Sequence, residues 1–186
     1  MPPKIRITKE SITDAAVEIV RTDGEEALNA RSIAAALHCS TQPVFSNFAS
    51  MNELRFAVLD RTEVILRDFI RQETESGKYL PYKAGGMAYI RFAREEKNLF
   101  RLLYMRDRST EEPRPESDLT DRMTGLVQGA TGFDPQKALL FHLEMWAFVH
   151  GVATMFATGY LDLDHELVSS MLTDIYQGLT KRFGGE

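Results

Sequence analysis

The fold of this chain is decided by residues 29–48, which read NARSIAAALHCSTQPVFSNF. Asn29 is a favoured helix N-cap. The apolar residues after it recur at helical spacing: Ile33, Ala34 and Leu37. Residues 38–39 form a tight turn, and Ser40 is expected to cap a further short helix over residues 41–48. Two short helices joined by a tight turn are typical of a helix-turn-helix motif.

One helix precedes this motif and a longer helix follows it. Thr8 is expected to cap the first helix and Gly24 to end it. The apolar stripe of this helix comprises Ile12, Ala15, Ala16, Ile19 and Val20. The long helix is expected to begin at Ser50 or Asn52. We therefore expect a helix-turn-helix domain over residues 1–50 and a helical domain over residues 51–186.

The rest of the chain also has helical patterning, with apolar residues three and four apart and no alternating runs of β-branched residues. Asn98 is expected to cap a short helix, and Asp134 followed by Pro135 to open a long one. The polar segment 106–115 is expected to be a mobile loop. The helices after the long fourth one are predicted over residues 81–95, 99–105, 116–129, 135–159 and from 164 onward. The chain is therefore expected to be all-α, with about nine helices.

Composition narrows the possible classes of protein. The net charge is −5 and the pI is about 5.5, which argues against a protein that coats nucleic acid indiscriminately. The single cysteine, Cys39, excludes an intrachain disulfide and fits a cytoplasmic location. The N-terminus does not resemble a signal peptide. The apolar stretch 139–161 contains His142, Glu144 and His150, which favours a buried helix over a membrane span.

Enzymatic function is not expected from this sequence. It contains no phosphate-binding glycine loop, no paired Cys or His spacing, and no nucleophile with a plausible base nearby. His142 and His150 are eight residues apart without an obvious third ligand, so we expect no metal site and no cofactor.

The first sixty residues resemble the tetracycline-repressor-like (TetR/AcrR) family of transcriptional regulators. The matching segments are the helix around Ile12, Ala15, Ala16 and Ile19, then Gly24, residues 27–34, residues 37–40, residues 44–48, and Glu53-Leu54. Further along, Trp146-xxx-His150-Gly151 looks like a motif of the Trp-His-Gly (WHG) branch of this family. The resemblance implies a DNA-binding regulator with a C-terminal domain for dimerisation and effector binding.

The resemblance also implies a role for individual residues. Arg31 would contact a phosphate, and Gln42 could read an adenine through two hydrogen bonds. Phe45 and Asn47 stand at positions that normally lie against the DNA backbone, and Phe48 would be a core aromatic. The predicted DNA-binding residues are Arg31, Ser40, Thr41, Gln42, Pro43, Phe45, Ser46 and Asn47.

The helix-turn-helix domain over residues 1–50, called the head from here on, has a different charge from that common in the family. Residues 1–50 contain five Lys and Arg against six acidic residues, and Ala49 and Met51 stand where the family commonly has lysines. A head with few phosphate contacts predicts weak non-specific binding and a shallow salt dependence. The alternative is a helical adaptor of the same fold that has lost specific DNA binding.

The long helix after Pro135 carries two apolar stripes. Small residues form one of them and bulky residues the other, among them Phe148, Val152 and Phe156. Since a small stripe lets another helix approach closely, we expect the last two helices of each chain to form a four-helix dimer interface. Its predicted residues are Ala147, Gly151, Thr154, Thr158, Met171 and Ile175. An intramolecular core is the alternative interpretation.

Aromatic and methionine residues gather in the middle of the chain. They could form part of the hydrophobic core or enclose an effector pocket. The family resemblance favours the pocket. The predicted pocket residues are Phe92, Phe100, Tyr104, Met123, Phe141, Met145 and Trp146. The sequence thus predicts a homodimeric repressor that binds a double-stranded, palindromic DNA operator and is released by an unknown small apolar effector, with no membrane partner.

Overall fold

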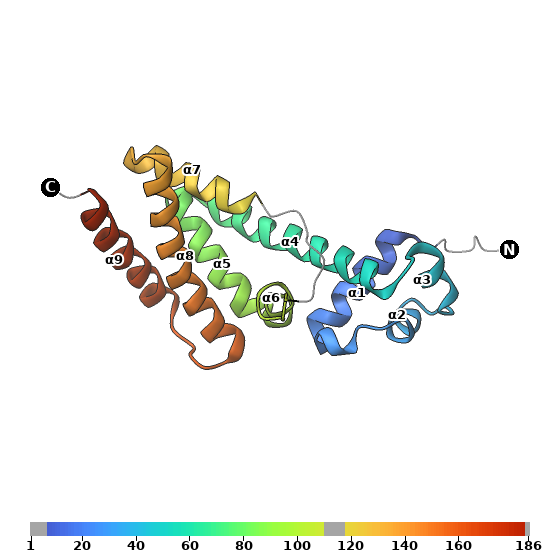
Figure 1. Cartoon of the computed structure of the whole chain (residues 1–186). Coiled ribbons are helices and arrows are strands. Elements are labelled where there is room, and N and C mark those ends of the chain that lie inside the picture. The colour runs from blue at the N-terminus through green and yellow to red at the C-terminus, as the bar shows by residue number, and fades with distance from the viewer. Residues whose placement is uncertain (1–6, 110–117, 185–186) are drawn as a thin grey trace. The chain divides into compact units, whose positions relative to one another are not determined.

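The computed structural model describes residues 7–109 and 118–184, and these residues form nine α-helices, one 3-10 helix and no strand (Figure 1). The predicted all-α fold and the predicted number of helices are confirmed. The helices are α1 (Lys9–Asp23), η1 (Glu25–Ala27), α2 (Ala30–Ala36), α3 (Gln42–Asn47), α4 (Met51–Glu75), α5 (Pro81–Glu95), α6 (Lys97–Tyr104), α7 (Leu119–Thr131), α8 (Pro135–Thr158) and α9 (His165–Gly184).

The chain divides into two compact units. The N-terminal unit comprises Met1–Ile65 and Glu96–Arg106, and the C-terminal unit comprises Leu66–Glu95 and Asp107–Glu186. The N-terminal unit therefore includes the first part of α4 and the whole of α6, in addition to the 1–50 segment expected from the sequence.

The N-terminal unit is held together by α1, which packs against α2, α3 and α6. The hydroxyl of Thr8 accepts the N–H of Ser11, whose own hydroxyl accepts the N–H of Thr8, so the helix begins with a reciprocal capping box. Gly24 ends α1 with a φ of 87°, which a side chain would disfavour. The fully buried residues of this core include Ile12, Val20, Ile33, Val44, Phe48, Leu54, Leu99 and Phe100.

Helix starts that depend on local sequence are confirmed at four positions. Thr8 and Asn29 cap α1 and α2, and Asp134 accepts the N–H of Lys137 at the start of α8. The carboxylate of Asp164 accepts the N–H of Leu167 at the start of α9. Each side-chain oxygen satisfies a backbone donor that the first helical turn leaves without a partner.

Asn98 does not cap α6, so that prediction was wrong. The helix begins two residues earlier than expected, with Glu96 at the N-cap and no side-chain capping bond. The side-chain amide of Asn98 donates instead to the carbonyl oxygens of Arg21 and Thr22. A contact with another helix has replaced the local bond, which sequence spacing alone does not reveal.

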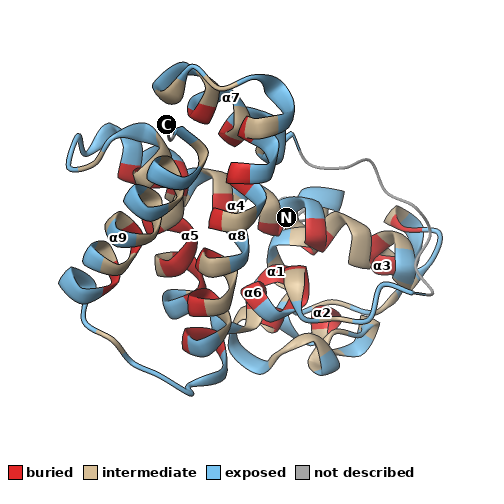
Figure 2. Cartoon of the chain, turned by 60° about the vertical axis from the view of Figure 1, so that its left-hand side comes forward, coloured by how far each residue is buried: buried red, intermediate tan, exposed pale blue. Residues whose placement is uncertain are grey.

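In the C-terminal unit, α5 packs against α7, α8 and α9, and α7 also packs against α8. Buried positions run along α5 (Figure 2), from Ala84 to Ala93. A second cluster comprises Val127, Ala138, Phe141 and Met145. Partly buried aromatic and aliphatic residues pack against it: Tyr82, Phe133, Ile175, Tyr176, Leu179 and Phe183.

By length and composition, α8 is the one helix in the described ranges that could cross a membrane, and 39% of its most apolar window is buried inside the protein. A core helix of a soluble domain meets the same criterion, so this property alone is weak support for a membrane span.

The predicted loop over residues 106–115 and the start of the predicted helix over 116–129 lie partly outside the described residues, which resume at Asp118. The helix is observed as α7, Leu119–Thr131.

Candidate nucleic-acid interface

The start of α2 is fixed by Asn29. Its side-chain oxygen lies 3.0 Å from the backbone nitrogens of both Arg31 and Ser32, which donate to it. The hydroxyl of Ser32 in turn accepts the N–H of Asn29 at 3.2 Å. This capping box holds Arg31 in the first turn of α2, where its side chain is exposed.

The turn between α2 and α3 closes on backbone hydrogen bonds. The N–H of Cys39 donates to the carbonyl oxygen of Ala34 at 2.9 Å, and His38 has a φ of 51°, in the left-handed region. A non-glycine residue rarely adopts this conformation. His38 therefore fixes a sharp change of direction between the two helices.

Ser40 does not cap α3, which corrects the sequence prediction. The N-cap is Thr41, without a side-chain capping bond, and Pro43 lies at the second helical position. Proline has no N–H, so one of the two backbone donors that a capping side chain uses is missing there. Ser40 is exposed just before the helix.

The short helix α3 has one buried and one exposed face. Val44 and Phe48 are 1% and 2% exposed and anchor the helix in the core. Gln42, Phe45 and Ser46 lie exposed, with Phe45 at 57% exposure. The hydroxyl of Ser46 donates to the carbonyl oxygen of Gln42 within the helix. The exposed face of α3 thus offers the amide of Gln42 and an aromatic ring.

The other predicted contact residues on α3 are less available. Thr41, Pro43 and Asn47 are half-buried. The amide nitrogen of Asn47 donates to the carbonyl oxygen of Pro43 at 2.8 Å. This bond occupies one donor of Asn47 within the helix, whereas Gln42 has no side-chain hydrogen bond to the described residues.

Two of the three Lys and Arg side chains between residues 7 and 50 are paired with carboxylates. Lys9 lies 2.6 Å from Glu53, and Arg21 contacts both Glu18 and Glu96. Arg31, by contrast, makes no ion pair within the described residues. It is therefore the one unpaired Lys or Arg side chain between residues 7 and 50, and it can donate to an external anion.

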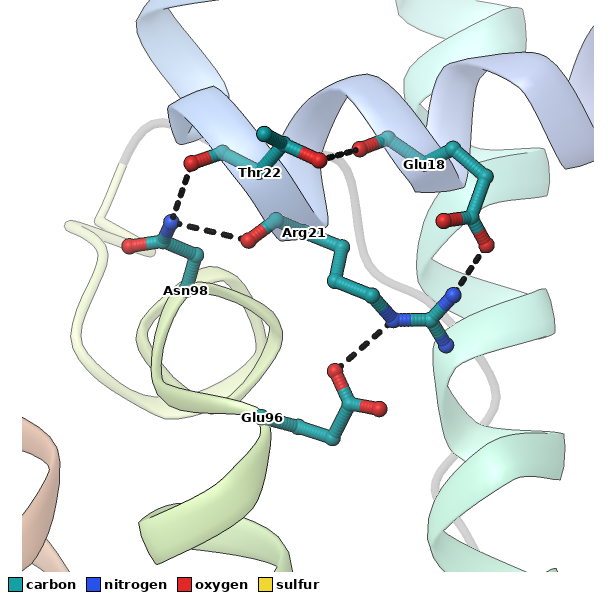
Figure 3. Close-up of polar contacts among 5 residues, drawn as sticks. All are labelled: Glu18, Arg21, Thr22, Glu96 and Asn98. Carbon is teal, nitrogen blue, oxygen red and sulfur yellow. Dashed lines mark hydrogen bonds and ion pairs between the residues drawn. The ribbon is translucent and has the colours of Figure 1, made fainter.

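Polar contacts join α6 to the end of α1 (Figure 3). Arg21 Nε donates to Glu96 at 2.8 Å, and the amide of Asn98 lies 3.0 Å from the carbonyl oxygen of Arg21 and 3.4 Å from that of Thr22. Carbonyl groups in the last turn of a helix have no partner within the helix. Asn98 supplies such a partner, so α6 completes the C-terminal end of α1.

The predicted effector-pocket residues are distributed over both units. In the C-terminal unit, Phe141 and Met145 share one buried cluster, and the ring of Phe92 packs edge-on against Phe69 at 5.5 Å. Met123 lies against Gly85, where an added Cβ would stand 2.7 Å from the methionine methyl group. These contacts bring Phe141 and Met145 together and place Met123 at the face of α5.

The remaining predicted pocket residues lie elsewhere. Phe100 and Tyr104 belong to the N-terminal unit, with their ring centroids 5.1 Å apart. Trp146 is 42% exposed and stacks on the imidazole of His150 at 4.8 Å. The structure therefore separates Trp146 from the buried cluster.

Two tyrosine–histidine pairs between α5 and α8 were missed in the sequence. The hydroxyl of Tyr82 lies 3.1 Å from Nδ1 of His142, and that of Tyr89 lies 2.9 Å from Nδ1 of His150. Burial lowers the pKa of both histidines and raises the pKa of Tyr82. The seven-residue and eight-residue spacings of these side chains, two turns of helix in each case, are the signal that could have paired them.

The predicted small stripe on α8 faces away from the core of the chain. Ala147 and Thr158 are exposed and Gly151 and Thr154 are half-buried. A Cβ built on Gly151 would meet no atom within 4 Å. Larger exposed apolar residues lie beside the stripe: Leu139, Leu140, Leu143, Trp146 and Met155.

The two predicted interface residues on α9 are half-buried. Ile175 packs against the cluster formed by Phe141 and Met145, so part of its surface serves the core of its own chain. Met171 lies one turn earlier on the same helix. Among the residues that the structure describes, no group of three His, Cys, Asp or Glu side chains could hold a metal ion.

Residues 82–175 match the family described as "Tetracyclin repressor-like, C-terminal domain". This match covers just over half of the chain, which therefore belongs to the tetracycline-repressor-like family of transcriptional regulators. The family consists of regulators and not of enzymes, which agrees with the sequence analysis. The matched family description does not specify the Trp-His-Gly branch, so that assignment stays a prediction. No curated protein matches the sequence.

Solved structures share this fold along nearly the whole chain. A protein of unknown function from Rhodococcus sp. RHA1 is 23% identical, with a TM-score of 0.75, over 97% of this chain and 100% of that one. The multidrug binding protein EbrR, complexed with imidazole, is 17% identical, with a TM-score of 0.64, over 91% and 95%. A TetR-family member, SCO1917 from Streptomyces coelicolor A3, is 18% identical, with a TM-score of 0.63, over 90% and 96%.

Proposed function

We propose that this protein is a homodimeric repressor that binds a palindromic DNA operator through α2 and α3 and is released by a small-molecule effector. The observation that carries the proposal is the pairing of an exposed recognition surface with an unpaired cation. Gln42 lies exposed at the start of α3, whose opposite face is locked into the core by Val44 and Phe48. Arg31 lies at the start of α2 without an ion pair in the described chain.

The side chains of Gln42 and Arg31 differ in chemistry, and we assign them different contacts with DNA. An exposed glutamine at the start of a helix can donate to N7 and accept from N6 of adenine in the major groove. An arginine at the start of the preceding helix can bind a backbone phosphate and fix the register without reading sequence. We place Ser40, Thr41, Ser46 and Asn47 around these contacts, and the ring of Phe45 against a sugar or a thymine methyl group.

The exposed side of α8 supports the homodimer. Three leucines and a tryptophan on this helix are more than 40% exposed: Leu139, Leu140, Leu143 and Trp146. An apolar surface of this kind on one helix is unusual for a monomer, and a second copy would remove it from water. Gly151 leaves open space in which a partner helix could approach closely.

The buried aromatic cluster of the C-terminal unit supports an effector site. Phe141 and Met145 offer an adaptable apolar wall, and the neighbouring Tyr82–His142 pair offers one polar group in its neutral form. EbrR, which shares the fold, is described as a multidrug binding protein. An effector would release the DNA only if it binds one conformation of the dimer more tightly than the other. We place the protein in the cytoplasm, where its DNA would be.

The internal ion pairs of Lys9 and Arg21 favour a second candidate, a helical adaptor of the same fold without specific DNA binding. The test measures binding of the purified protein to DNA from upstream of its own gene and to scrambled DNA, across a salt series. Sequence-dependent binding by a dimer supports the repressor. Equal binding to both DNAs at every salt concentration contradicts it and favours the adaptor.

A further inference from the structure

A group of hydrogen-bond donors in the C-terminal unit lacks a matching number of acceptors. The ammonium nitrogen of Lys78 lies 3.0 Å from Nε2 of His165, and the hydroxyl of Tyr79 lies 2.8 Å from the same nitrogen. Nε2 accepts one of these hydrogen bonds when it is the unprotonated nitrogen of a neutral imidazole, and it accepts neither when it carries a proton. At least one strong donor at this exposed point is therefore left for water or for an acceptor from outside the protein.

A second ammonium group adds to the positive charge. Lys83 lies 4.9 Å from the centre of the Tyr79 ring, and Lys78 lies 5.2 Å from it. Lys83 also donates to the hydroxyl of Thr173 at 2.7 Å. Neither lysine forms an ion pair with a carboxylate of the described residues. Two unneutralised charges thus converge on one ring in a protein whose net charge is −5.

Three acidic side chains close in sequence are engaged elsewhere, whereas Glu166, which follows His165, is exposed and forms no ion pair with the described residues. The carboxylate of Asp164 accepts the N–H of Leu167 at 2.8 Å, and Glu75 pairs with Arg71 at 3.2 Å. Asp162 pairs with Arg94 at 2.9 Å. Asp164, Glu75 and Asp162 therefore do not accept hydrogen bonds from Lys78 or Tyr79.

We infer that Lys78, Tyr79 and His165 form a binding site for a small oxyanion, a phosphate or a carboxylate group, with Lys83 strengthening the local positive potential. The anion accepts from the ammonium group of Lys78 and from the hydroxyl of Tyr79 or the imidazole of His165. Charge-assisted hydrogen bonds of this kind are about twice as strong as neutral ones. The site belongs to the C-terminal unit, shares no residue with the helix-turn-helix, and does not depend on DNA binding.

The test follows the imidazole resonances of His165 by NMR while inorganic phosphate, acetate or chloride is added at constant ionic strength. A saturating shift with phosphate or acetate, and none with chloride, is expected. Saturation by both oxyanions assigns a general oxyanion site, and saturation by one of them identifies the preferred group. The same gradual shift with all three salts, or no shift, would overturn the inference because it reports screening alone.

Substitutions of single lysines show which side chains donate to the anion. Lys78→Met should weaken binding about tenfold because it removes a charge-assisted hydrogen bond, and Lys83→Met should weaken it less. Lys137→Met is the matched control, since Lys137 also lies over an aromatic ring, that of Phe133 at 4.8 Å, and pairs with no carboxylate of the described chain. Equal affinity in Lys78→Met and Lys137→Met would contradict the assignment. All three lysines are outside the buried core, and circular dichroism checks that the variants fold.

Discussion

The side-chain amide nitrogen of Asn98 lies 3.0 Å from the carbonyl oxygen of Arg21, so that a residue of α6 satisfies a backbone group at the end of α1. Asn98→Ala should lower the free energy of unfolding by about 1 kcal/mol, because it leaves that carbonyl and its neighbour without a protein partner. Urea denaturation measures the change.

Asn52→Ala is the matched control for this substitution. Asn52 is exposed in the first turn of α4 and makes no side-chain hydrogen bond to the described residues. Its substitution should leave the free energy of unfolding nearly unchanged. If Asn98→Ala and Asn52→Ala were equally stable, the bond between α6 and α1 would contribute nothing.

Arg31→Ala should weaken binding to operator and scrambled DNA alike and reduce the steepness of the salt dependence by about one unit for each lost phosphate contact. Fluorescence anisotropy across a salt series measures both effects. Lys97→Ala is the control, because Lys97 is also exposed, belongs to the same unit and has no carboxylate partner in the described chain. An unchanged salt slope in Arg31→Ala would refute the docking of α2 against the backbone.

Gln42→Ala should act on sequence preference and not on the salt slope. Loss of a two-bond contact to adenine should reduce discrimination at one base pair by about 1–3 kcal/mol. Competition binding with single-base operator variants measures the preference at each position. A uniform loss of affinity across all variants would mean that Gln42 contacts the backbone instead of a base.

Leu143→Glu should convert the proposed dimer to a monomer, because it places a charge in the apolar surface of α8 that we propose as the interface. Light scattering coupled to gel filtration measures the mass. Val64→Glu is the control, since Val64 on α4 is 47% exposed and Leu143 is 45% exposed. A dimer that survives Leu143→Glu would place the interface elsewhere.

Stability should fall as the pH falls below about 6.5, the usual pKa of histidine. Burial lowers the pKa of His142 and His150 in the folded protein. Below about 6.5 the unfolded chain therefore binds protons that the folded chain does not, and the stability contributed by the neutral imidazoles is lost as the pH approaches their folded pKa. Denaturation midpoints at several pH values measure this.

His142→Gln should flatten that pH dependence, because it removes one of the two titrating groups. His38→Asn is the control, since His38 is exposed and asparagine tolerates its positive φ. A pH profile that His142→Gln leaves as steep as before would show that other groups cause the loss of stability.

Structural features that depend on a few neighbouring residues are predictable from the sequence. Asn29 and Asp134 cap helices because their side chains reach backbone donors two or three residues ahead, and such bonds need no tertiary contact. Ser40 does not cap α3, because Pro43 in the first turn of this helix has no backbone N–H to donate. Asn98 failed because the carbonyl groups of a distant helix competed for its amide.

Exposure in the C-terminal unit was harder to predict. A helix that is apolar on several sides does not show which side its own chain covers and which side a partner covers. The sequence therefore groups Trp146 with Met145, although the structure buries the methionine and exposes the indole. Pairing Tyr82 with His142 needed the relative position of α5 and α8, which periodicity does not give.

The ion pairs of Lys9 and Arg21 bear on how such a regulator would behave in a living cell. Each phosphate contact makes the logarithm of affinity fall with the logarithm of salt with a slope of about −0.9. A dimer with one arginine contact in each head would lose only about 3.5-fold in affinity when the salt concentration doubles, whereas eight contacts would cost more than about 100-fold. A head that neutralises its own cations would therefore hold its affinity for DNA nearly constant when the ionic strength changes.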